Sequence, residues 1–274
     1  MTNSIEPYLT IFQTSYNHDV SVYDDTFLQN LINDRKRELA LVTDIEYQNY
    51  LESNTAEAAL FKSRLNNSYS EFFRNPLTFA YLEQVILPQL IEKKKIKKEN
   101  QIRIWSAACA SGQEAYSLAI LCNELIETKK VDINYLIFAT DIDPDELGNA
   151  QKGIYQSETL SKVTLKRAQT YFNKKGETYA IVPQLRNRID FSVFNLISDQ
   201  GSCPPTSIYG NFDLVFCSNL LFYYKPECRN QMLEKIGSSL AKGGYLVTGE
   251  TEREIIKRNN YREVFVNSAI FQKK

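Results

Sequence analysis

Apolar and polar positions follow two different patterns along the chain, and the pattern changes near residue 100. In the first part apolar residues recur at helical spacing, as in Phe27, Leu31 and Ile32 of the stretch 26–39. The same spacing predicts further helices over 44–52, 55–65 and 77–91, with Pro88 as an interruption or kink. The first part of the chain is therefore expected to be helical.

Beyond residue 100 short apolar runs alternate with helical patterns. Strands are predicted over 102–106, 134–140, 191–193, 212–217, 245–248 and 264–272, and helices over 115–127, 143–151 and 160–171. The alternation pauses between 153 and 191, where 179–182 and 188–191 read as short strands. Alternating strands and helices indicate an α/β fold with a parallel sheet.

A charged run separates the helical part of the chain from the part in which strands and helices alternate. Residues 92–100 read EKKKIKKEN, which is typical of a solvated helix end and linker. We therefore expect a helical N-terminal domain over 1–95 and an α/β domain over 96–274.

The stretch from Ile102 to Ser117 holds the first candidate for a binding site. An apolar strand turns through small residues, including Ser111 and Gly112, and leaves as a helix whose first residues include Glu114. A small turn lets a ligand approach the backbone and the free amides of the helix N-terminus. Because Gly112 is its only glycine, the turn is not a dinucleotide fingerprint, and an ordinary strand-to-helix connection stays open at this point.

A second candidate follows the next strand. The run YLIFAT ends in Asp141, and a carboxylate just past the second strand is where nucleoside-binding sheets hold ribose hydroxyls. Asp143-Pro144 also reads as a helix start, so Asp143 serves as an N-cap in the alternative interpretation. Both interpretations are compatible, with Asp143 capping and Asp141 binding.

Composition excludes several classes of function. The chain has 274 residues, 43% of them hydrophobic, and its formal net charge of −1 favours neither nucleic acid nor an anionic membrane. The five cysteines are scattered, which argues against a disulfide framework and against a zinc site. His18 is the single histidine, so no metal site is expected. The N-terminus lacks a signal-peptide pattern and no apolar run is long enough to span a membrane, so we expect a cytoplasmic protein without membrane insertion.

Five blocks of sequence, in order, resemble the chemotaxis receptor methyltransferases of the CheR family. The blocks are SEFFRNP, WSAACASGQEAYSLA, FATDIDPDELGNAQKGIY, FDLVFCSNLLFYY and LAKGGYLVTGETE. The resemblance implies a Rossmann-like class I methyltransferase sheet, a small helical N-terminal domain and a small β-subdomain over 154–191. It also implies S-adenosylmethionine as cofactor, S-adenosylhomocysteine as product, and methylation of receptor glutamates.

The resemblance implies roles for individual residues. Arg74 and Tyr223 are expected to face the acceptor carboxylate, and Arg74 also lies beside the donor pocket. The expected cofactor-binding residues are Ser68, Ser70, Arg74, Ser111, Gly112, Glu114, Asp141, Ile142, Asn195, Leu196, Asn219 and Leu220. The expected partner is the cytoplasmic domain of a chemoreceptor, bound without its tether peptide by a monomeric enzyme, because the hairpin at 174–182 is short.

Departures from the family pattern leave alternatives open. Ser218 stands where arginine is usual, Glu250 where histidine is usual, and Gln29 and Asn30 where arginines are common. The donor-binding positions are mostly intact, whereas those expected to meet the receptor are less so. A methyltransferase of another acidic substrate, and a donor-binding signalling module without activity, are therefore the alternative hypotheses.

Overall fold

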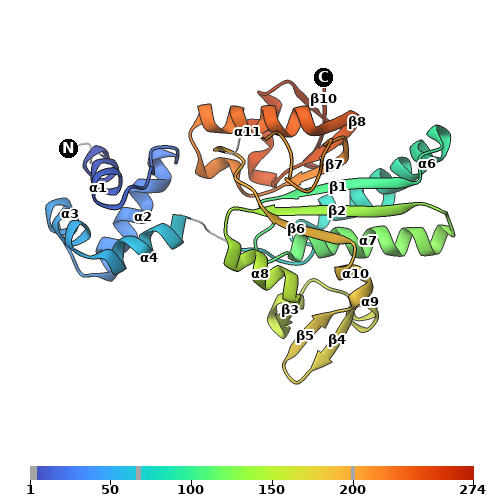
Figure 1. Cartoon of the computed structure of the whole chain (residues 1–274), viewed down its shortest axis with the longest axis horizontal. Helices are drawn as coiled ribbons and strands as arrows, with labels where there is room; N and C mark the ends of the chain where they lie inside the picture. The colour runs from blue at the N-terminus through green and yellow to red at the C-terminus, as the bar shows by residue number, and fades with distance from the viewer. Residues whose placement is uncertain (1–4, 66–68, 199–200) are drawn as a thin grey trace. The chain divides into compact units, whose positions relative to one another are not determined.

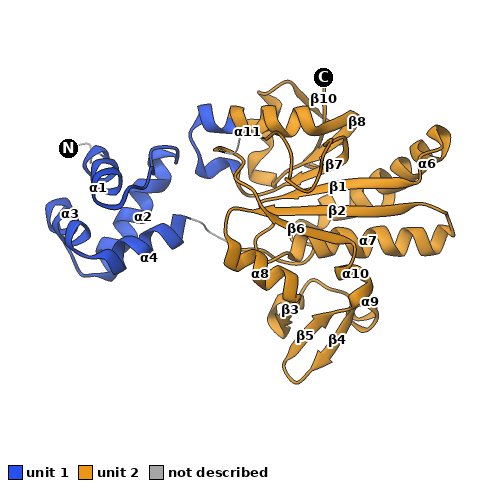
Figure 2. Ribbon diagram, viewed as in Figure 1, with its two compact units in different colours: residues 1–67, 221–229 blue, residues 68–220, 230–274 orange. Residues whose placement is uncertain are grey.

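The computed structural model describes residues 5–65, 69–198 and 201–274. Its contacts divide the chain into two compact units, shown in Figure 2. One unit comprises residues 1–67 and 221–229, and the other comprises residues 68–220 and 230–274. Figure 1 labels most helices and strands of both.

The first unit is helical, as predicted. Its helices are α1 (Glu6–Tyr16), α2 (Asp25–Glu38), α3 (Asp44–Ser53) and α4 (Thr55–Leu65). Aromatic rings fill its core, with Phe12 and Phe61 at 4.8 Å between ring centroids. A buried ion pair joins α2 to α4, because Arg35 donates to both oxygens of Glu57 at 2.9 and 2.6 Å. The Tyr47 hydroxyl donates to the same carboxylate at 2.8 Å, so α3 is joined to the pair as well.

A segment from late in the sequence completes the first unit. It contains the 3₁₀ turn η3 (Leu221–Tyr223) and the start of α11 (Pro226–Ser239). The Asp24 amide donates to the Tyr223 carbonyl at 2.8 Å, and the Lys225 amide donates to the Val22 carbonyl at 2.9 Å. These backbone bonds explain why the segment groups with helices that lie two hundred residues earlier in the chain.

The second unit contains a seven-stranded sheet in the order β6-β2-β1-β7-β8-β10-β9. Its strands are β1 (Gln101–Ala107), β2 (Asn134–Asp141), β6 (Ile189–Val193), β7 (Phe212–Cys217), β8 (Leu240–Val247), β9 (Tyr261–Glu263) and β10 (Ile270–Lys273). The pairs β1–β2, β1–β7, β2–β6 and β7–β8 are parallel, and β10 is antiparallel to both of its neighbours. The predicted Rossmann-like α/β fold is thereby confirmed.

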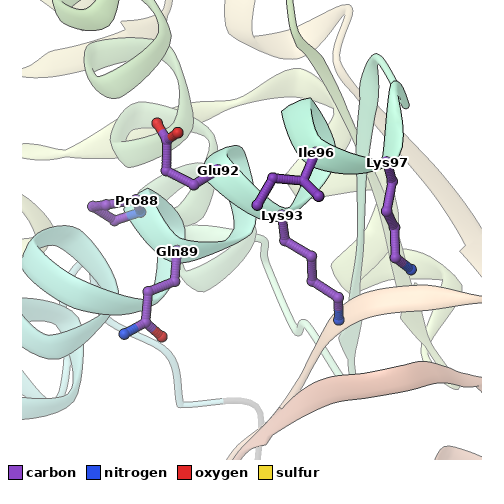
Figure 3. A pocket seen from close by; sticks show the side chains of 6 residues that line it. All are labelled: Pro88, Gln89, Glu92, Lys93, Ile96 and Lys97. Atoms are coloured by element: carbon purple, nitrogen blue, oxygen red, sulfur yellow. The ribbon is translucent and has the colours of Figure 1, made fainter.

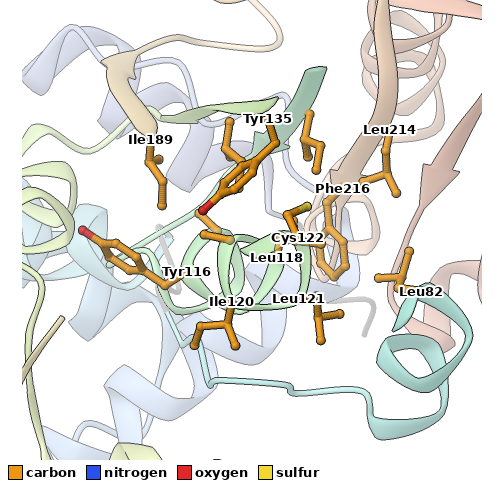
Figure 4. Close-up of a cluster of buried hydrophobic side chains, with 14 of the residues drawn as sticks. Leu82, Tyr116, Leu118, Ile120, Leu121, Cys122, Tyr135, Ile189, Leu214 and Phe216 are labelled. Carbon is orange, nitrogen blue, oxygen red and sulfur yellow. The ribbon is translucent and has the colours of Figure 1, made fainter. Parts of the chain in front are cut away.

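Helices cover the sheet. They are α5 (Pro76–Tyr81), the π-helical turn η1 (Leu82–Ile86), α6 (Leu87–Lys97), α7 (Gln113–Lys129), α8 (Pro144–Lys152) and α12 (Arg253–Lys257), with the 3₁₀ turn η4 (Glu250–Glu252). Figure 4 shows how side chains of α7, such as Leu118 and Leu121, meet Leu214 and Phe216 of β7 in one buried cluster. Every residue of α7 from Gln113 to Cys122 is buried, so the first half of this helix is enclosed on all of its faces.

A small antiparallel sheet in the order β3-β5-β4 lies within the second unit. Its elements are β3 (Ile154–Gln156), η2 (Ser157–Leu160), α9 (Leu165–Tyr171), β4 (Phe172–Lys175), β5 (Thr178–Ile181) and α10 (Pro183–Arg186). We call residues 154–186 the β-subdomain. They fall within the stretch where the sequence loses its strand–helix alternation.

Two local expectations differ from the structure. The charged run at 92–100 forms the end of α6, and α6 packs through Leu90 and Ile91 into the core of the sheet unit. The contacts therefore divide at 67/68, whereas the sequence suggested 95/96. The run 264–272 is not one strand, because a turn interrupts it before β10. Within the described ranges, no helix is both long and apolar enough to cross a membrane.

The buried Arg35–Glu57 pair makes a prediction about the helical unit. Glu57→Gln removes the buried charge partner of the Arg35 guanidinium and leaves only Glu38, whose side chain is half exposed, so we expect a loss of about 3 kcal/mol of unfolding free energy. Urea denaturation measures this loss. The control Glu52→Gln, at an exposed position of α3, should change stability by less than about 0.5 kcal/mol. Equal effects of the two substitutions would contradict a structural role for the pair.

Candidate active site

The strand order reverses between β1 and β7. From β1 the chain proceeds to β2 and β6 on one side, and later to β7 and β8 on the other. Open α/β sheets bind ligands outside the carboxyl ends of the strands at such a reversal. The loops after β1, β2 and β7 therefore form the candidate site.

The turn after β1 has an unusual backbone. Ala108, Ala110 and Gly112 all have positive φ angles, of 55°, 46° and 90°. Left-handed geometry costs a non-glycine residue roughly 1–2 kcal/mol, and such strain gathers at functional sites. A Cβ atom at position 112 would lie 2.9 Å from the Ala150 Cβ, so glycine is required where α7 begins against α8.

Asp141 closes this turn from the end of β2. Its Oδ2 accepts a hydrogen bond from the Ala110 amide at 2.8 Å, and its Oδ1 accepts one from the Asp143 amide at 3.0 Å. Burial raises the pKa of Asp141, and the backbone hydrogen bonds oppose that rise. A carboxylate has about four acceptor sites, so acceptor capacity remains for a ligand hydroxyl. Asp143 caps α8 through bonds from the amides of Asp145 and Glu146, as the alternative interpretation of this stretch required.

Glu114 is a buried carboxyl group in the first turn of α7. Its Oε1 is among the buried side-chain oxygens that have no hydrogen-bond partner within the described part of the chain. Burial raises its pKa to about 8, while the charge of Arg74 lowers it and that of Glu252 raises it. A buried, unpaired carboxyl group at a candidate ligand site fits a cationic ligand group such as an ammonium.

The loop after β7 is held by Glu252. The Asn219 and Leu220 amides each donate to this carboxylate at 2.8 Å, and the Thr248 hydroxyl donates at 2.7 Å. Glu252 is fully buried, and the Gly249 amide donates to it at 2.9 Å. Asn219 is left-handed, with a φ of 60°, and accepts a bond from the Ser218 hydroxyl. Glu252 thus fixes both predicted donor-binding residues of this loop.

Residues 69–74 form a compact loop, which we call the Arg74 loop. Arg74 donates to the Tyr69 carbonyl at 3.0 Å and lies 5.1 Å from the centroid of the Tyr69 ring. The Phe73 amide donates to the Ser117 hydroxyl of α7 at 3.0 Å. Within the described ranges the buried Ser70 hydroxyl has no partner, which leaves it available to a ligand. Ser68, also predicted to bind the donor, lies outside the described residues.

The remaining predicted donor-binding residues lie near the ends of β2 and β6. Leu196 is buried, whereas Ile142 is exposed. The Asn195 side-chain oxygen accepts bonds from the amides of Ile197 and Ser198 at 2.8 and 3.1 Å, so it shapes its own turn. The Phe194 amide donates to the Asp141 carbonyl at 3.0 Å, which brings the start of this turn to the end of β2.

Tyr223 belongs to the helical unit, whereas Arg74 belongs to the sheet unit. Within its own unit the Tyr223 ring packs edge-on against Phe27, with 4.8 Å between the ring centroids. Its predicted partnership with Arg74 at an acceptor carboxylate stays a prediction.

A shallow pocket lies elsewhere, on α6. Its lining combines aliphatic groups and lysines, and Figure 3 shows the six side chains: Pro88, Gln89, Glu92, Lys93, Ile96 and Lys97. Because α6 leads into the start of β1, this pocket lies away from the carboxyl ends of the strands. It does not take part in the site described above.

The comparison with protein families matches residues 68–270 to "CheR methyltransferase, SAM binding domain". The chain belongs to the CheR methyltransferase family. The match begins where the sheet unit begins and contains all three loops of the candidate site.

Relatives from several bacteria agree with this membership. A chemotaxis protein methyltransferase of Listeria monocytogenes is 32% identical over 255 residues, which is 93% of this chain and 91% of the relative. Chemotaxis protein methyltransferase 1 of Pseudomonas aeruginosa is 36% identical over 66% of this chain and 64% of its own length. The Escherichia coli chemotaxis protein methyltransferase is 31% identical, with coverages of 80% and 73%.

S-adenosylmethionine is the cofactor of this CheR methyltransferase. The buried Glu114 fits the ammonium group of the donor, and the remaining acceptor capacity of Asp141 fits a ribose hydroxyl. The residues present thus agree with the group that the family binds.

Sequence reasoning assigned no role to Glu252 or Ser117, although both lie in the blocks that carry the family resemblance. Glu252 accepts hydrogen bonds from the Asn219 and Leu220 amides, and Ser117 accepts one from the Phe73 amide. These partners lie more than thirty positions away in the sequence, so no local pattern reveals the contacts. The glutamate that ends the last block was the one available signal for Glu252.

Glu114 makes a prediction about stability and pH. Its pKa is about 8 in the folded protein, above its ordinary value of 4.5, so the folded state holds a proton that the unfolded state releases. The stability from this proton is present below pH 4.5 and is lost as pH rises through 8. From pH 5 to pH 8 the ligand-free protein should lose about 1.4 kcal/mol per pH unit through this group.

Chemical denaturation of the ligand-free protein at pH 5 and pH 8 measures this dependence. Glu114→Gln cannot ionise, so its stability relative to the wild type should rise between the two pH values. The control Glu254→Gln, at an exposed position of α12, should keep the wild-type pH dependence. A constant difference between Glu114→Gln and the wild type would show that Glu114 titrates normally.

Proposed function

We propose that this CheR methyltransferase transfers a methyl group from S-adenosylmethionine to glutamate carboxylates of a chemoreceptor's cytoplasmic domain. The observation that carries the proposal is the buried Glu114 beside the strained turn of β1, whose Oε1 has no hydrogen-bond partner among the described residues, within a match to the whole donor-binding domain. The names of the relatives, which are chemotaxis protein methyltransferases, support the receptor as substrate.

The donor is held by three groups of residues in this proposal. Glu114, with Ser111 and Gly112, holds its amino-acid part, and Asp141 holds the ribose. The adenine and the middle of the donor are surrounded by Ser68, Ser70, Ile142, Asn195, Leu196, Asn219 and Leu220. The amide and Leu side chains suit an adenine edge and face, and the hydroxyls suit a polar ligand. The sulfonium of the bound donor supplies an electrophilic methyl group.

The acceptor needs orientation and no general base. A glutamate side chain exposed to water has a pKa of about 4.3 and is ionised at neutral pH, so no proton has to be removed. Arg74 and Tyr223 orient this carboxylate through charge-assisted hydrogen bonds. The chain's single histidine, His18, follows α1 in the helical unit, so the proposed mechanism assigns it no role. Catalysis rests on alignment of the reacting groups.

We further propose a monomeric, cytoplasmic enzyme that binds the receptor without a tether peptide. In the β-subdomain the strands β4 and β5 have four residues each and offer a short edge, which supports the absence of tether binding.

A second candidate keeps the chemistry and changes the acceptor to another acidic substrate. In α2 the basic side chains are engaged within the helical unit: Arg35 pairs with Glu57, Lys36 with Asp44, and Arg37 with Asp34. Together with Gln29 and Asn30, this leaves α2 with less unpaired positive charge for an acidic receptor surface.

A labelling experiment tests the proposal. The wild type is incubated with methyl-labelled S-adenosylmethionine and membranes of the source organism, followed by mild alkali. Label on a membrane protein that leaves as volatile methanol supports receptor carboxyl methylation. Alkali-labile label confined to soluble proteins or small molecules supports the second candidate, and no label despite donor binding contradicts both.

Arg74→Ala should lower methyl transfer by about 100-fold or more, because the acceptor carboxylate loses its orienting partner. The matched control is Arg262→Ala, on the edge strand β9, which should keep wild-type turnover. Near wild-type turnover in Arg74→Ala would remove this residue from the mechanism.

A further inference from the structure

Several side-chain contacts join the Arg74 loop to the β-subdomain. Phe72 is fully buried, and its ring meets Tyr155 of β3 and Phe172 of β4 edge-on, at 4.9 and 5.3 Å between centroids. The loop therefore contributes one aromatic side chain to the core of the β-subdomain. Its neighbours Phe73 and Arg74 follow directly in the chain.

Two cations of the β-subdomain contact the same loop. Lys162 donates to the Glu71 carboxylate at 2.6 Å and to the Arg74 carbonyl at 3.2 Å. The Arg167 guanidinium of α9 lies over the face of the Phe73 ring, with 4.8 Å from its central carbon to the ring centroid. Both contacts join residues about ninety positions apart in the sequence.

Arg167 is itself held in place. It donates to both oxygens of Glu124 on α7, at 2.7 to 3.2 Å, and to Glu83 at 2.8 Å. Glu83 lies in the π-helical turn η1, a geometry that is rare and often found at functional sites. Only 15% of the Arg167 side chain is exposed, so these charge-assisted bonds act in a partly desolvated environment.

Phe73 needs such support because its backbone is strained. Its φ of 52° is left-handed, which a bulky side chain adopts only when the surroundings enforce it. Ser117 accepts its amide hydrogen, Arg167 covers one face of its ring, and Phe79 meets the ring at 5.2 Å. The left-handed residue sets the direction in which the chain continues into Arg74.

We propose that Arg167 and Lys162 are positioning residues for Arg74, and that the β-subdomain serves as a scaffold for this part of the active site. Arg167 acts through Phe73, and Lys162 acts through the carbonyl of Arg74. This inference rests on the proposed function, in which Arg74 orients the acceptor carboxylate.

Hydrogen exchange tests the attachment without reference to activity. In Arg167→Ala the Phe73 amide loses its packing support, so exchange within residues 69–74 should become about tenfold faster or more. The matched control is Lys166→Ala, one residue away on α9, where the structure describes an exposed side chain. It should exchange like the wild type. Unchanged exchange in Arg167→Ala overturns the proposal.

Methyl-transfer kinetics test the positioning role. Arg167→Ala should lower kcat/KM for the acceptor between about tenfold and a hundredfold, because small misplacements of a reacting group are costly. In an Arg74→Lys background the same substitution should lower it by less than about threefold, since the group that it positions is already altered. An equal loss in both backgrounds indicates a merely structural role and overturns the proposal.

A second variant and the activity of the wild type separate failure of this proposal from failure of folding and from failure of the proposed function. If Arg167→Ala does not fold, Arg167→Lys provides the same tests, because it keeps a cation over Phe73 and loses the paired bonds to Glu124. It should exchange faster than the wild type by about threefold or more. If the wild type transfers no methyl group to any carboxylate, the proposed function fails, and exchange alone decides whether the β-subdomain holds the loop.

Discussion

The hydrogen bond from the Ala110 amide to Asp141 is the contact on which the donor site depends. It joins the turn after β1 to the end of β2, and so holds a backbone that is left-handed at three alternate positions. Because that turn leads directly into α7, the same bond sets where the helix begins. Asp141 thereby fixes the turn by accepting a backbone hydrogen bond on each of its oxygens. The carboxylate keeps acceptor capacity for a ligand hydroxyl. In the proposed function, this one carboxylate both supports the turn and binds the donor.

Burial of the Glu114 carboxyl group is unfavourable for the ligand-free fold. A buried carboxyl group without a hydrogen-bond partner destabilises the ligand-free protein, and its raised pKa is the measure of that cost. The fold tolerates it in the ligand-free state because the carboxyl group keeps its proton at neutral pH and so avoids a buried charge. A bound ammonium group then supplies the missing partner. In the proposed function, the unfavourable position of Glu114 in the ligand-free state and its affinity for the donor are two consequences of the same burial.

The sequence predicted the features that depend on neighbouring residues. The strand–turn–helix around Gly112 and the carboxylate at Asp141 follow from local apolar patterns, and the structure places both at one edge of the sheet. Contacts between distant segments could not be predicted. The apolar stripe of 77–91 indicated burial without indicating its partner, so the domain boundary was expected at 95/96, beyond the 67/68 division of the contacts. Likewise, the bonds of Glu252 to the loop after β7 span more than thirty residues and leave no periodic signal.

Calorimetry of S-adenosylhomocysteine binding at pH 7, in two buffers of different ionisation enthalpy, tests the central claim most directly. If Glu114 is protonated in the ligand-free protein and ionised beside the ligand's ammonium group, binding should release about one proton from the wild type. Glu114→Gln should bind more weakly and release none. Binding enthalpies that do not differ between the buffers for the wild type would contradict the assignment of Glu114 as the partner of the donor's amino group.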